Sequence, residues 1–348
     1  MTKERIFAIV LIILALTGIV LSFLPSNKSK SSKSSFDLYK ALPVGAVSGD
    51  KILSLSLNGV IVDGETQSVL GNETSEAVKV RQELSKLLKD YKENKVKGLL
   101  IRINSPGGTV GISQEIYHLV REIRKKMPVV ISMGDLAASG GYYIASAGDV
   151  IYANPGTLTG SIGVIAQGFI FKGLMDKLGV QDNTFKAGKY KDIASFTRSM
   201  TDEEKAILQE LLDDTYDQFV TDVYEGRRSE KYSSIRRKMT KEYVQSIAKG
   251  LIYTGRQALK YGLVDELGGY DQALDTLQSL VKERSEGKIK DDLKVIYTVR
   301  SAESLKDILN LNINYQQPQP QIGFAGLIQS LPGRLWLLAP ELISNNLY

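Results

Sequence analysis

The chain has 348 residues, 43% of them hydrophobic, which suffices for the core of one large domain or two ordinary ones and excludes a disordered protein. Lys and Arg outnumber Asp and Glu by 44 to 39, and the net charge of +5 suits an anionic membrane surface, a nucleic acid or an ordinary solvated surface. The absence of cysteine excludes disulfides, thiol catalysis and cysteine-bound metals, and the single histidine, His118, makes a histidine triad or a histidine-rich metal site hard to build.

An uncharged stretch of nineteen residues, 6–24, follows a short N-terminal flank at 1–5. This length spans a bilayer, whereas a cleavable signal peptide has an apolar core of about 7 to 15 residues and a small-residue cleavage site. The sequence Phe-Leu-Pro closes the stretch instead, so we predict an uncleaved transmembrane anchor. Lysines on both sides roughly balance, and charge alone leaves its orientation open. Residues 25–50, rich in Ser and Lys, are expected to form a flexible tether.

Strand-like and helix-like patterns alternate from Lys51 onward. Short apolar or alternating runs predict strands, and apolar residues spaced by three and four predict helices, the first of them capped by Ser75. The alternation predicts an α/β fold with a largely parallel sheet of repeated β-α-β units, in one domain over 51–300. The expected strands are 52–57, 98–103, 128–133, 150–153 and 159–165, and the expected helices are 75–95, 113–126, 169–178, 201–225, 227–249 and 270–281.

The helix expected at 201–225 is long and amphipathic, and the end of the chain has a different composition. Residues 316–321 combine Gln and Pro, which is typical of a polyproline-like linker, and 322–348 is rich in Leu, Ile and Phe and holds the only tryptophan. We therefore treat 301–348 as a separate C-terminal tail. Helical spacing predicts that these residues of the long helix face the core: Ile207, Leu211, Leu212, Phe219 and Val223.

Residues 104–108 read Asn-Ser-Pro-Gly-Gly, directly after a predicted buried strand and before a helix. Two adjacent glycines let backbone N–H groups approach a ligand closely, as an oxyanion hole or an anion-binding loop requires. Ser-Pro-Gly-Gly is also an ordinary turn sequence, so the motif alone does not establish a site.

A second motif, residues 135–143, places Ser139 between small residues after another predicted strand. Small neighbours allow a sharp turn that leaves the hydroxyl open at the start of a helix. There the Gly140 amide and the helix dipole would help to stabilise an oxyanion. A serine that caps a tightly packed helix fits the same pattern.

A serine hydroxyl becomes a good nucleophile only when a nearby group takes its proton. His118 is a weak candidate because it lies on the surface or flank of an amphipathic helix, without an evident orienting partner. A lysine can serve if burial lowers its pKa from about 10.4 by roughly three units. The stretch 185–192 offers Lys186, Lys189 and Lys191, and spacing does not choose among them, since most such lysines are solvated surface charges.

Five segments together resemble the bacterial signal peptide peptidase A family of Ser/Lys peptidases, whose fold is related to Clp protease and the crotonases. They extend over roughly 51–281 in the family's order, and the chain is similar to the short form of the family, with one catalytic domain per chain. The segments are 104–108, 135–143, 158–164 (Leu-Thr-Gly-Ser-Ile-Gly-Val), 189–191 (Lys-Tyr-Lys) and 262–269 (Gly-Leu-Val-Asp-Glu-Leu-Gly-Gly).

The resemblance implies roles for individual residues. Ser139 would be the nucleophile and Lys191 the general base. The amides of Gly108 and Gly140 would form the oxyanion hole, and Ser161 would hydrogen-bond the lysine amine and position it. The resemblance implies no metal, no cofactor and no nucleic acid partner.

The resemblance also implies a membrane-anchored serine endopeptidase that degrades remnant signal peptides and other unfolded apolar peptides. Short forms assemble into a homo-oligomeric ring, an octamer, in which the serine and the lysine of one site come from neighbouring subunits. The catalytic domain would lie outside the cytoplasm, held at the cell membrane by lipid contacts of the single N-terminal helix. From its composition, we expect the apolar tail at 322–348 to be a self-processing or self-inhibiting segment that occupies a site groove.

Two other functions fit parts of the pattern. A crotonase-like acyl-CoA enzyme would share the Gly-Gly oxyanion hole on the same fold, but it needs neither a membrane anchor nor the pair of Ser139 and Lys191. A catalytically silent membrane scaffold would keep the fold and lose the reactive serine. A fluorophosphonate probe separates the scaffold from a peptidase, because an unactivated serine does not react.

Overall fold

The computed structural model describes residues 47–68, 71–228, 239–289, 293–297 and 336–338. No helix in this part of the chain is long and apolar enough to cross a membrane. The predicted anchor at 6–24 lies outside the described residues, as do most of the predicted tether and most of the C-terminal tail.

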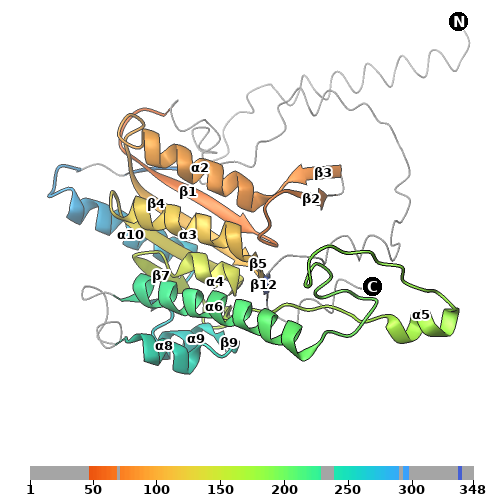
Figure 1. The fold of residues 1–348 in the computed structure, drawn as a ribbon. Coiled ribbons are helices and arrows are strands. Elements are labelled where there is room, and N and C mark those ends of the chain that lie inside the picture. The colour runs from red at the N-terminus through yellow and green to blue at the C-terminus, as the bar shows by residue number, and fades with distance from the viewer. Residues whose placement is uncertain (1–46, 69–70, 229–238, 290–292, 298–335, 339–348) are drawn as a thin grey trace, which may run out of the picture. The chain divides into compact units, whose positions relative to one another are not determined.

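An eight-stranded sheet forms the centre of the fold (Figure 1). Its main path runs in the order β10-β7-β6-β4-β1-β11, and every neighbouring pair along this path is parallel. This arrangement confirms the predicted α/β fold with a parallel sheet. The strands of the path are β1 (Lys51–Asn58), β4 (Val96–Ser105), β6 (Val129–Ala138), β7 (Val150–Ala153), β10 (Glu266–Leu267) and β11 (Lys294–Tyr297).

Strand β6 is longer than predicted and continues beyond its pairing with β7. Its last three residues pair with a further parallel strand, β8 (Leu158–Gly160), which in turn pairs antiparallel with β9 (Ile252–Thr254). β8 ends at Gly160, well short of the predicted residue 165, because Ser161 has a φ of 50° and leaves the extended conformation. The end of β6 is therefore held by β8 at the point where the chain reaches Ser139.

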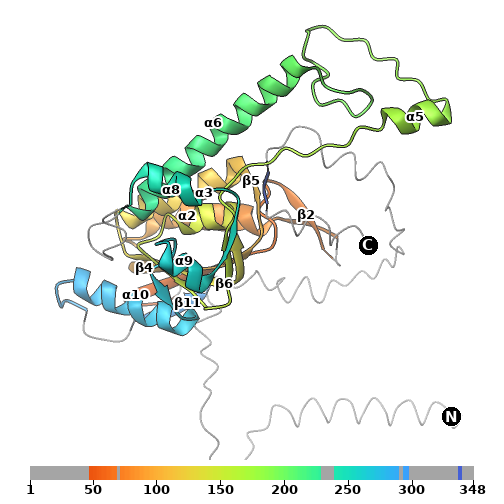
Figure 2. The ribbon, with the colours of Figure 1, turned by 90° about the horizontal axis from the view of Figure 1, so that it is seen from below.

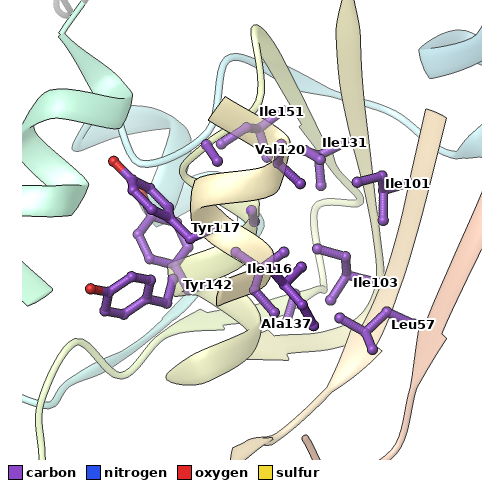
Figure 3. Close-up of a cluster of buried hydrophobic side chains, with 14 of the residues drawn as sticks. Leu57, Ile101, Ile103, Ile116, Tyr117, Val120, Ile131, Ala137, Tyr142 and Ile151 are labelled. Carbon is purple, nitrogen blue, oxygen red and sulfur yellow. The ribbon is translucent and has the colours of Figure 1, made fainter. Parts of the chain in front are cut away.

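Helices cover both faces of the sheet (Figures 1 and 2). Alternate residues of each strand face opposite layers, so that Leu53 packs into one core and Ile52 into the other. Figure 3 shows Ile116 and Val120 of α3 in the larger core, among side chains of the sheet. The larger core contains residues of α2 (Glu76–Asp90), α3 (Val110–Arg124), α4 (Gly140–Ala145) and α6 (Asp202–Arg227), and the smaller one contains residues of α10 (Tyr270–Arg284).

Most predicted helices are confirmed, with different ends. Ser75 caps α2 as predicted, since its side chain accepts a hydrogen bond from Val78 N at 3.2 Å, but the helix stops at Asp90. The region predicted to be helical at 227–249 contains one short described helix, and 229–238 lies outside the described residues. The remaining elements are α5 (Lys172–Leu178), α8 (Lys241–Ile247), α9 (Gly255–Lys260), the hairpin of β2 (Glu65–Ser68) and β3 (Gly71–Thr74), and the pair β5 (Gly107–Thr109) and β12 (Trp336–Leu338).

The prediction that the apolar residues of 201–225 all face the core is wrong for the first half of α6. Phe219 and Val223 are fully buried, whereas Leu211 is 48% exposed and Ile207 and Leu212 are only partly buried. The physical reason is visible in Figure 2, where the N-terminal half of α6 extends past the sheet and has no core to face. Helical spacing shows which residues share a face and does not show what covers that face.

Candidate active site

Ser139 lies at the turn between β6 and α4, with φ 53° and ψ −118°. A non-glycine residue in such a conformation is strained by about 1 to 3 kcal/mol, and the surrounding backbone holds it there. Its N–H donates to Gly160 O and its carbonyl accepts from Tyr143 N, both at 2.8 Å. Ser139 is 1% exposed, and its Oγ has no hydrogen-bond partner among the described residues. The sharp turn predicted from the small neighbours is present, and the side chain makes no helix-capping bond.

Gly108 and Gly140 lie side by side next to Ser139. A Cβ on Gly140 would lie 3.2 Å from the amide nitrogen of Gly108 and 2.7 Å from Ser113 Oγ, and a Cβ on Gly108 would lie 1.8 Å from Ile61 O. Any side chain at Gly108 would clash with the Ile61 backbone, and any side chain at Gly140 would require the Ser113 hydroxyl to turn away. As the first residue of α4, Gly140 also has an N–H without a partner inside the helix. The backbone amide of Gly108 therefore lies close to Gly140, the residue that follows Ser139.

The Asn-Ser-Pro-Gly-Gly motif is tied to the strand that carries Ser139. Asn104 Oδ1 accepts a hydrogen bond from Leu136 N at 3.1 Å, and a Cβ on Gly134 would lie 2.8 Å from the same oxygen. Ser105 Oγ accepts from Gly107 N at 3.0 Å and supports the turn before Gly108. The two sequence motifs therefore form one connected structure at the carboxyl ends of β4 and β6.

Ser161 follows directly after the residue that binds the Ser139 backbone. It is 3% exposed, has φ 50°, and its N–H donates to Leu251 O at 2.7 Å. It lines a cavity of about 430 Å³ between the segment after β8 and α6. The cavity wall from α6 includes Gln209, Asp213 and Tyr216. The structure thus places Ser161 directly after Gly160, which binds the Ser139 backbone, and in the wall of a cavity lined by both polar and apolar residues.

Lys191 belongs to a different part of the chain, the arm, which we define as residues 165–200 between β8 and α6. Figures 1 and 2 show α5 and the rest of the arm extending away from the sheet, beyond the start of α6. Lys191 is exposed, and its backbone N–H donates to Gly188 O at 3.2 Å. Within the described chain its Nζ makes no hydrogen bond or ion pair, so no bond joins it to Ser139. The structure brings the other predicted site residues together and leaves Lys191 apart.

Comparison with known proteins places this site in a family. The model of peptidase family S49 matches residues 121–284, and the Clp protease model matches 65–157. A putative protease, slr0021, of Synechocystis is 44% identical over 223 residues, which are 64% of this chain and 72% of the relative. A putative signal peptide peptidase SppA of Enterococcus faecium is 38% identical over 264 residues, 76% of this chain and 70% of the relative. The chain belongs to the signal peptide peptidase A family, peptidase family S49.

Membership in family S49 makes the chain a serine endopeptidase that acts on peptides, and it sets aside the crotonase-like enzyme and the silent scaffold. Among solved structures, a variant of the 1510-N membrane-bound stomatin-specific protease covers 73% of this chain and 100% of its own, with a TM-score of 0.43 and 15% identity.

The three lysines near residue 190 differ in their partners in this S49 peptidase. Lys186 Nζ donates to Asp192 Oδ1 at 2.5 Å, and Lys189 Nζ donates to Glu203 Oε2 at 2.5 Å. The hydrogen bond to Glu203 raises the pKa of Lys189, which is the opposite of what a general base needs. Lys191 is the member of the trio without a carboxylate partner among the described residues.

His118 does not belong to the S49 site. It is exposed on α3, as the sequence indicated, and its ring contacts Tyr117 edge-on with centroids 5.3 Å apart. The tyrosines of α4 instead anchor the helix that follows the turn at Ser139. Tyr143 donates a hydrogen bond to Asp222 of α6 and stacks on Phe219 at 4.4 Å, and burial raises its pKa. The C-terminal half of α6 thus packs against the helix that begins at the serine.

Several residues around the site were not found by sequence reasoning. Ile61 forms a parallel bridge with Gly108, and its carbonyl accepts from Thr109 N at 2.8 Å. Ser113 Oγ lies 2.7 Å from the position that a Cβ on Gly140 would take. Neither residue belongs to a motif, because each reaches the site through the fold. The described piece of the tail, β12, lies antiparallel to β5 with Leu337 opposite Gly108.

Proposed function

We propose that this S49 peptidase uses a Ser139/Lys191 dyad completed between subunits, in which the Lys191 amine of one subunit reaches the Ser139 hydroxyl of its neighbour. The observation that supports the proposal is that neither the Ser139 hydroxyl nor the Lys191 amine has a hydrogen-bond partner in the described structure. Ser139 Oγ is buried without a partner in the described structure, and Lys191 stands exposed on the arm. A buried hydroxyl without a hydrogen bond is unfavourable by about 1 to 3 kcal/mol, and an arriving amine would satisfy it.

The proposed mechanism is acyl transfer. The neutral Lys191 amine takes the proton of Ser139 Oγ as this oxygen attacks the peptide carbonyl. The amides of Gly108 and Gly140 bind the oxyanion that forms, and Lys191 then gives its proton to the leaving amine. Water, activated by the same lysine, hydrolyses the acyl-enzyme. Each amide lost would reduce kcat by about 10² to 10³.

The Lys191 amine must be neutral before it can act, so its pKa has to fall in the assembly. An exposed lysine has a pKa of about 10.4, and burial away from water and from carboxylates can lower it by about three units. The cavity beside Ser161 would receive the amine. Its wall includes Ser161, Gly250 and Tyr216, and also Asp213, whose carboxylate would have to pair with another cation such as Lys249 of the same wall. There Ser161 Oγ would accept a hydrogen bond from the amine and hold it toward Ser139.

Exposed apolar side chains on the arm support assembly. Soluble chains rarely leave many large apolar residues uncovered on one segment, and such surfaces commonly mark interfaces. Neighbours packed in a ring, which we propose to be an octamer, would cover the arm and the exposed half of α6. The exposed apolar residues of the arm are Phe169, Ile170, Leu174, Leu178, Val180, Phe185 and Phe196.

Substrates are proposed to be remnant signal peptides and other unfolded apolar peptides, bound as an extra strand. The pairing of β12 with β5 supports this, because it places an antiparallel strand across Gly108. A peptide bound along the same edge would present its carbonyl to the two glycine amides. The tail would compete for this edge and so restrain the enzyme.

The membrane setting is part of the proposal. Residues 6–24 would anchor the chain in lipid of the cell membrane, 25–50 would tether the catalytic domain of 51–300, and the domain would lie outside the cytoplasm. This position would put the enzyme beside the apolar fragments that signal peptidase leaves in the bilayer.

The test is hydrolysis of an apolar fluorogenic peptide by the full chain in detergent. Ser139→Ala and Lys191→Ala should each reduce kcat/KM by at least about 10³, while the matched neighbour Lys189→Ala keeps activity within a few fold. Fluorophosphonate labelling of Ser139 should be lost in Lys191→Ala of confirmed assembly. Activity retained by Lys191→Ala and lost in Lys189→Ala would contradict the assignment of the base.

A further inference from the structure

Arg198 connects the loop that carries Lys191 to the first turn of α6. Its guanidinium donates from Nε to Asp192 Oδ2 at 2.8 Å and from the terminal nitrogens to Glu204 at 2.8 and 2.5 Å. Glu204 is 4% exposed and also accepts from Thr201 N at 2.8 Å, as part of the capping box of α6. Arg198 thereby ties Asp192 to a fixed point of the helix.

Asp192 is the residue next to Lys191, and both of its carboxylate oxygens are occupied. Oδ2 accepts from Arg198, and Oδ1 accepts from Lys186 Nζ at 2.5 Å. These hydrogen bonds, of which the one from Arg198 has the largest effect, hold the pKa of Asp192 well below its usual range. A full negative charge therefore lies one residue from the proposed base. If that carboxylate paired with Lys191, it would raise the pKa of the lysine and hold the amine back from its serine.

The other carboxylates near the loop are occupied in the same way. Glu203 accepts from Lys189 Nζ at 2.5 Å and from the Tyr190 hydroxyl, and Asp202 accepts from Lys205 at 2.8 Å. In the described structure, each charged group of the loop and of the first turn of α6 therefore has an ion-pair partner, with Lys191 as the exception. The groups concerned are Lys186, Lys189, Tyr190, Asp192, Arg198, Asp202, Glu203, Glu204 and Lys205.

We propose that Arg198 is a positioning residue that sequesters the Asp192 carboxylate from Lys191 and so leaves the Lys191 amine free to enter the neighbouring subunit. The inference rests on the proposed Ser139/Lys191 function. It goes beyond that function because it assigns a task to an arginine that touches neither the substrate nor the serine. The capping box of α6 keeps its own bond from Glu204 N to Thr201 Oγ1 at 3.2 Å, so the helix start does not depend on Arg198 alone.

The experiment measures kcat/KM against pH for the full chain in detergent with an apolar fluorogenic peptide. In Arg198→Gln, Asp192 keeps Lys186 on Oδ1, but its freed Oδ2 should pair with Lys191. The acid limb of the profile should then move to higher pH by about one unit, with kcat at neutral pH falling about tenfold. KM should change little, since the peptide does not contact Arg198. Adding Asp192→Asn to Arg198→Gln should bring the limb back, and Arg198→Lys should keep it near its original position.

The matched control is Lys205→Gln, which breaks the exposed pair with Asp202 in the same turn and should leave the profile unchanged. An unmoved limb in Arg198→Gln overturns the inference, as does a moved limb that Asp192→Asn does not restore. If Arg198→Gln has no measurable activity, recovery in the double variant supports the inference and lack of recovery overturns it. Failure of the underlying function has a different signature, which is full activity in Lys191→Ala.

Discussion

At the scale of single residues, the site is built on two strained serines joined by one glycine. Ser139 and Ser161 have φ of 53° and 50°, and Gly160 between them accepts the hydrogen bond from Ser139 N. Glycine would adopt these conformations with less strain but has no hydroxyl. The strain of about 1 to 3 kcal/mol at each serine is of the kind that folded proteins keep at functional sites.

Gly140→Ala tests the oxyanion hole directly. The added Cβ would lie 2.7 Å from Ser113 Oγ, which must turn away, and 3.2 Å from Gly108 N, which is close enough to press the two glycines slightly apart. We expect kcat to fall by about 10² to 10³ with KM nearly unchanged, measured as peptide hydrolysis. Gly111→Ala on α3 is the matched control, because a Cβ there meets nothing within 4 Å and activity should be kept. Equal activity of the two variants would contradict the role of Gly140.

Sequence reasoning reached part of the site at this scale. The sharp turn at Ser139 could be predicted because small neighbours are a local signal. The neighbours Ile61 and Ser113 could not, because only the folded chain brings them to the glycines. Spacing also left Lys186, Lys189 and Lys191 equivalent, whereas their carboxylate partners in the fold distinguish them.

At the scale of elements, α6 connects the two halves of the proposed site. Its C-terminal half packs Phe219 against Tyr143 behind the turn at Ser139, and its first turn holds the loop of Lys191 through Arg198 and Glu204. A helix 26 residues long is a stiff spacer of about 39 Å at 1.5 Å per residue. The position of the lysine loop relative to its own serine is therefore set by α6.

The junction of the loop and α6 should weaken in acid. The Arg198 hydrogen bonds lower the pKa of Glu204 from 4.5 to about 2. A lowered folded-state pKa stabilises the junction fully above pH 4.5, and this contribution is lost as the pH falls toward 2. Hydrogen-exchange protection of residues 202–206 should decrease between pH 5 and pH 2.5. In Glu204→Gln this protection should already be low at pH 5 and should not decrease further. A decrease of equal size in that variant would contradict the assignment to Glu204.

The N-terminal half of α6 shows where prediction from sequence stops at this scale. The β-α-β order and most helix positions follow from local apolar periodicity, and they were confirmed. Ile207, Leu211 and Leu212 have the same periodicity as Phe219 and Val223, but they lie beyond the sheet. A pattern that a subunit interface would bury is indistinguishable in sequence from one that the chain's own core buries.

At the scale of the whole molecule, the described chain has a buried serine hydroxyl without a hydrogen-bond partner and an arm whose apolar side chains are exposed. The arm bears apolar residues such as Phe185, which is 88% exposed, and it bears Lys191, the proposed general base. A ring of identical subunits would account for both features, because each arm would be covered by a neighbouring subunit and would bring its Lys191 to the Ser139 of that neighbour. The account therefore makes activity a property of the assembly.

Phe185→Asp should separate folding from assembly. Because Phe185 is exposed, a charge at this position cannot disturb the core, but it would be unfavourable in a dry interface between subunits. We expect unchanged thermal unfolding of the catalytic domain, loss of the ring in native mass spectrometry and loss of nearly all peptidase activity. Lys177→Asp places the same charge on α5 at an exposed polar position and should keep both ring and activity. An active monomer of Phe185→Asp would contradict the account.

The most direct test of shared sites is to co-express Ser139→Ala and Lys191→Ala chains with different tags, purify mixed rings and measure peptide hydrolysis. Sites formed between subunits predict that each variant alone is inactive, while random mixing in equal amounts restores about one site in four. Mixed rings as inactive as the separate variants would contradict the account, because both groups of each site would then come from a single chain.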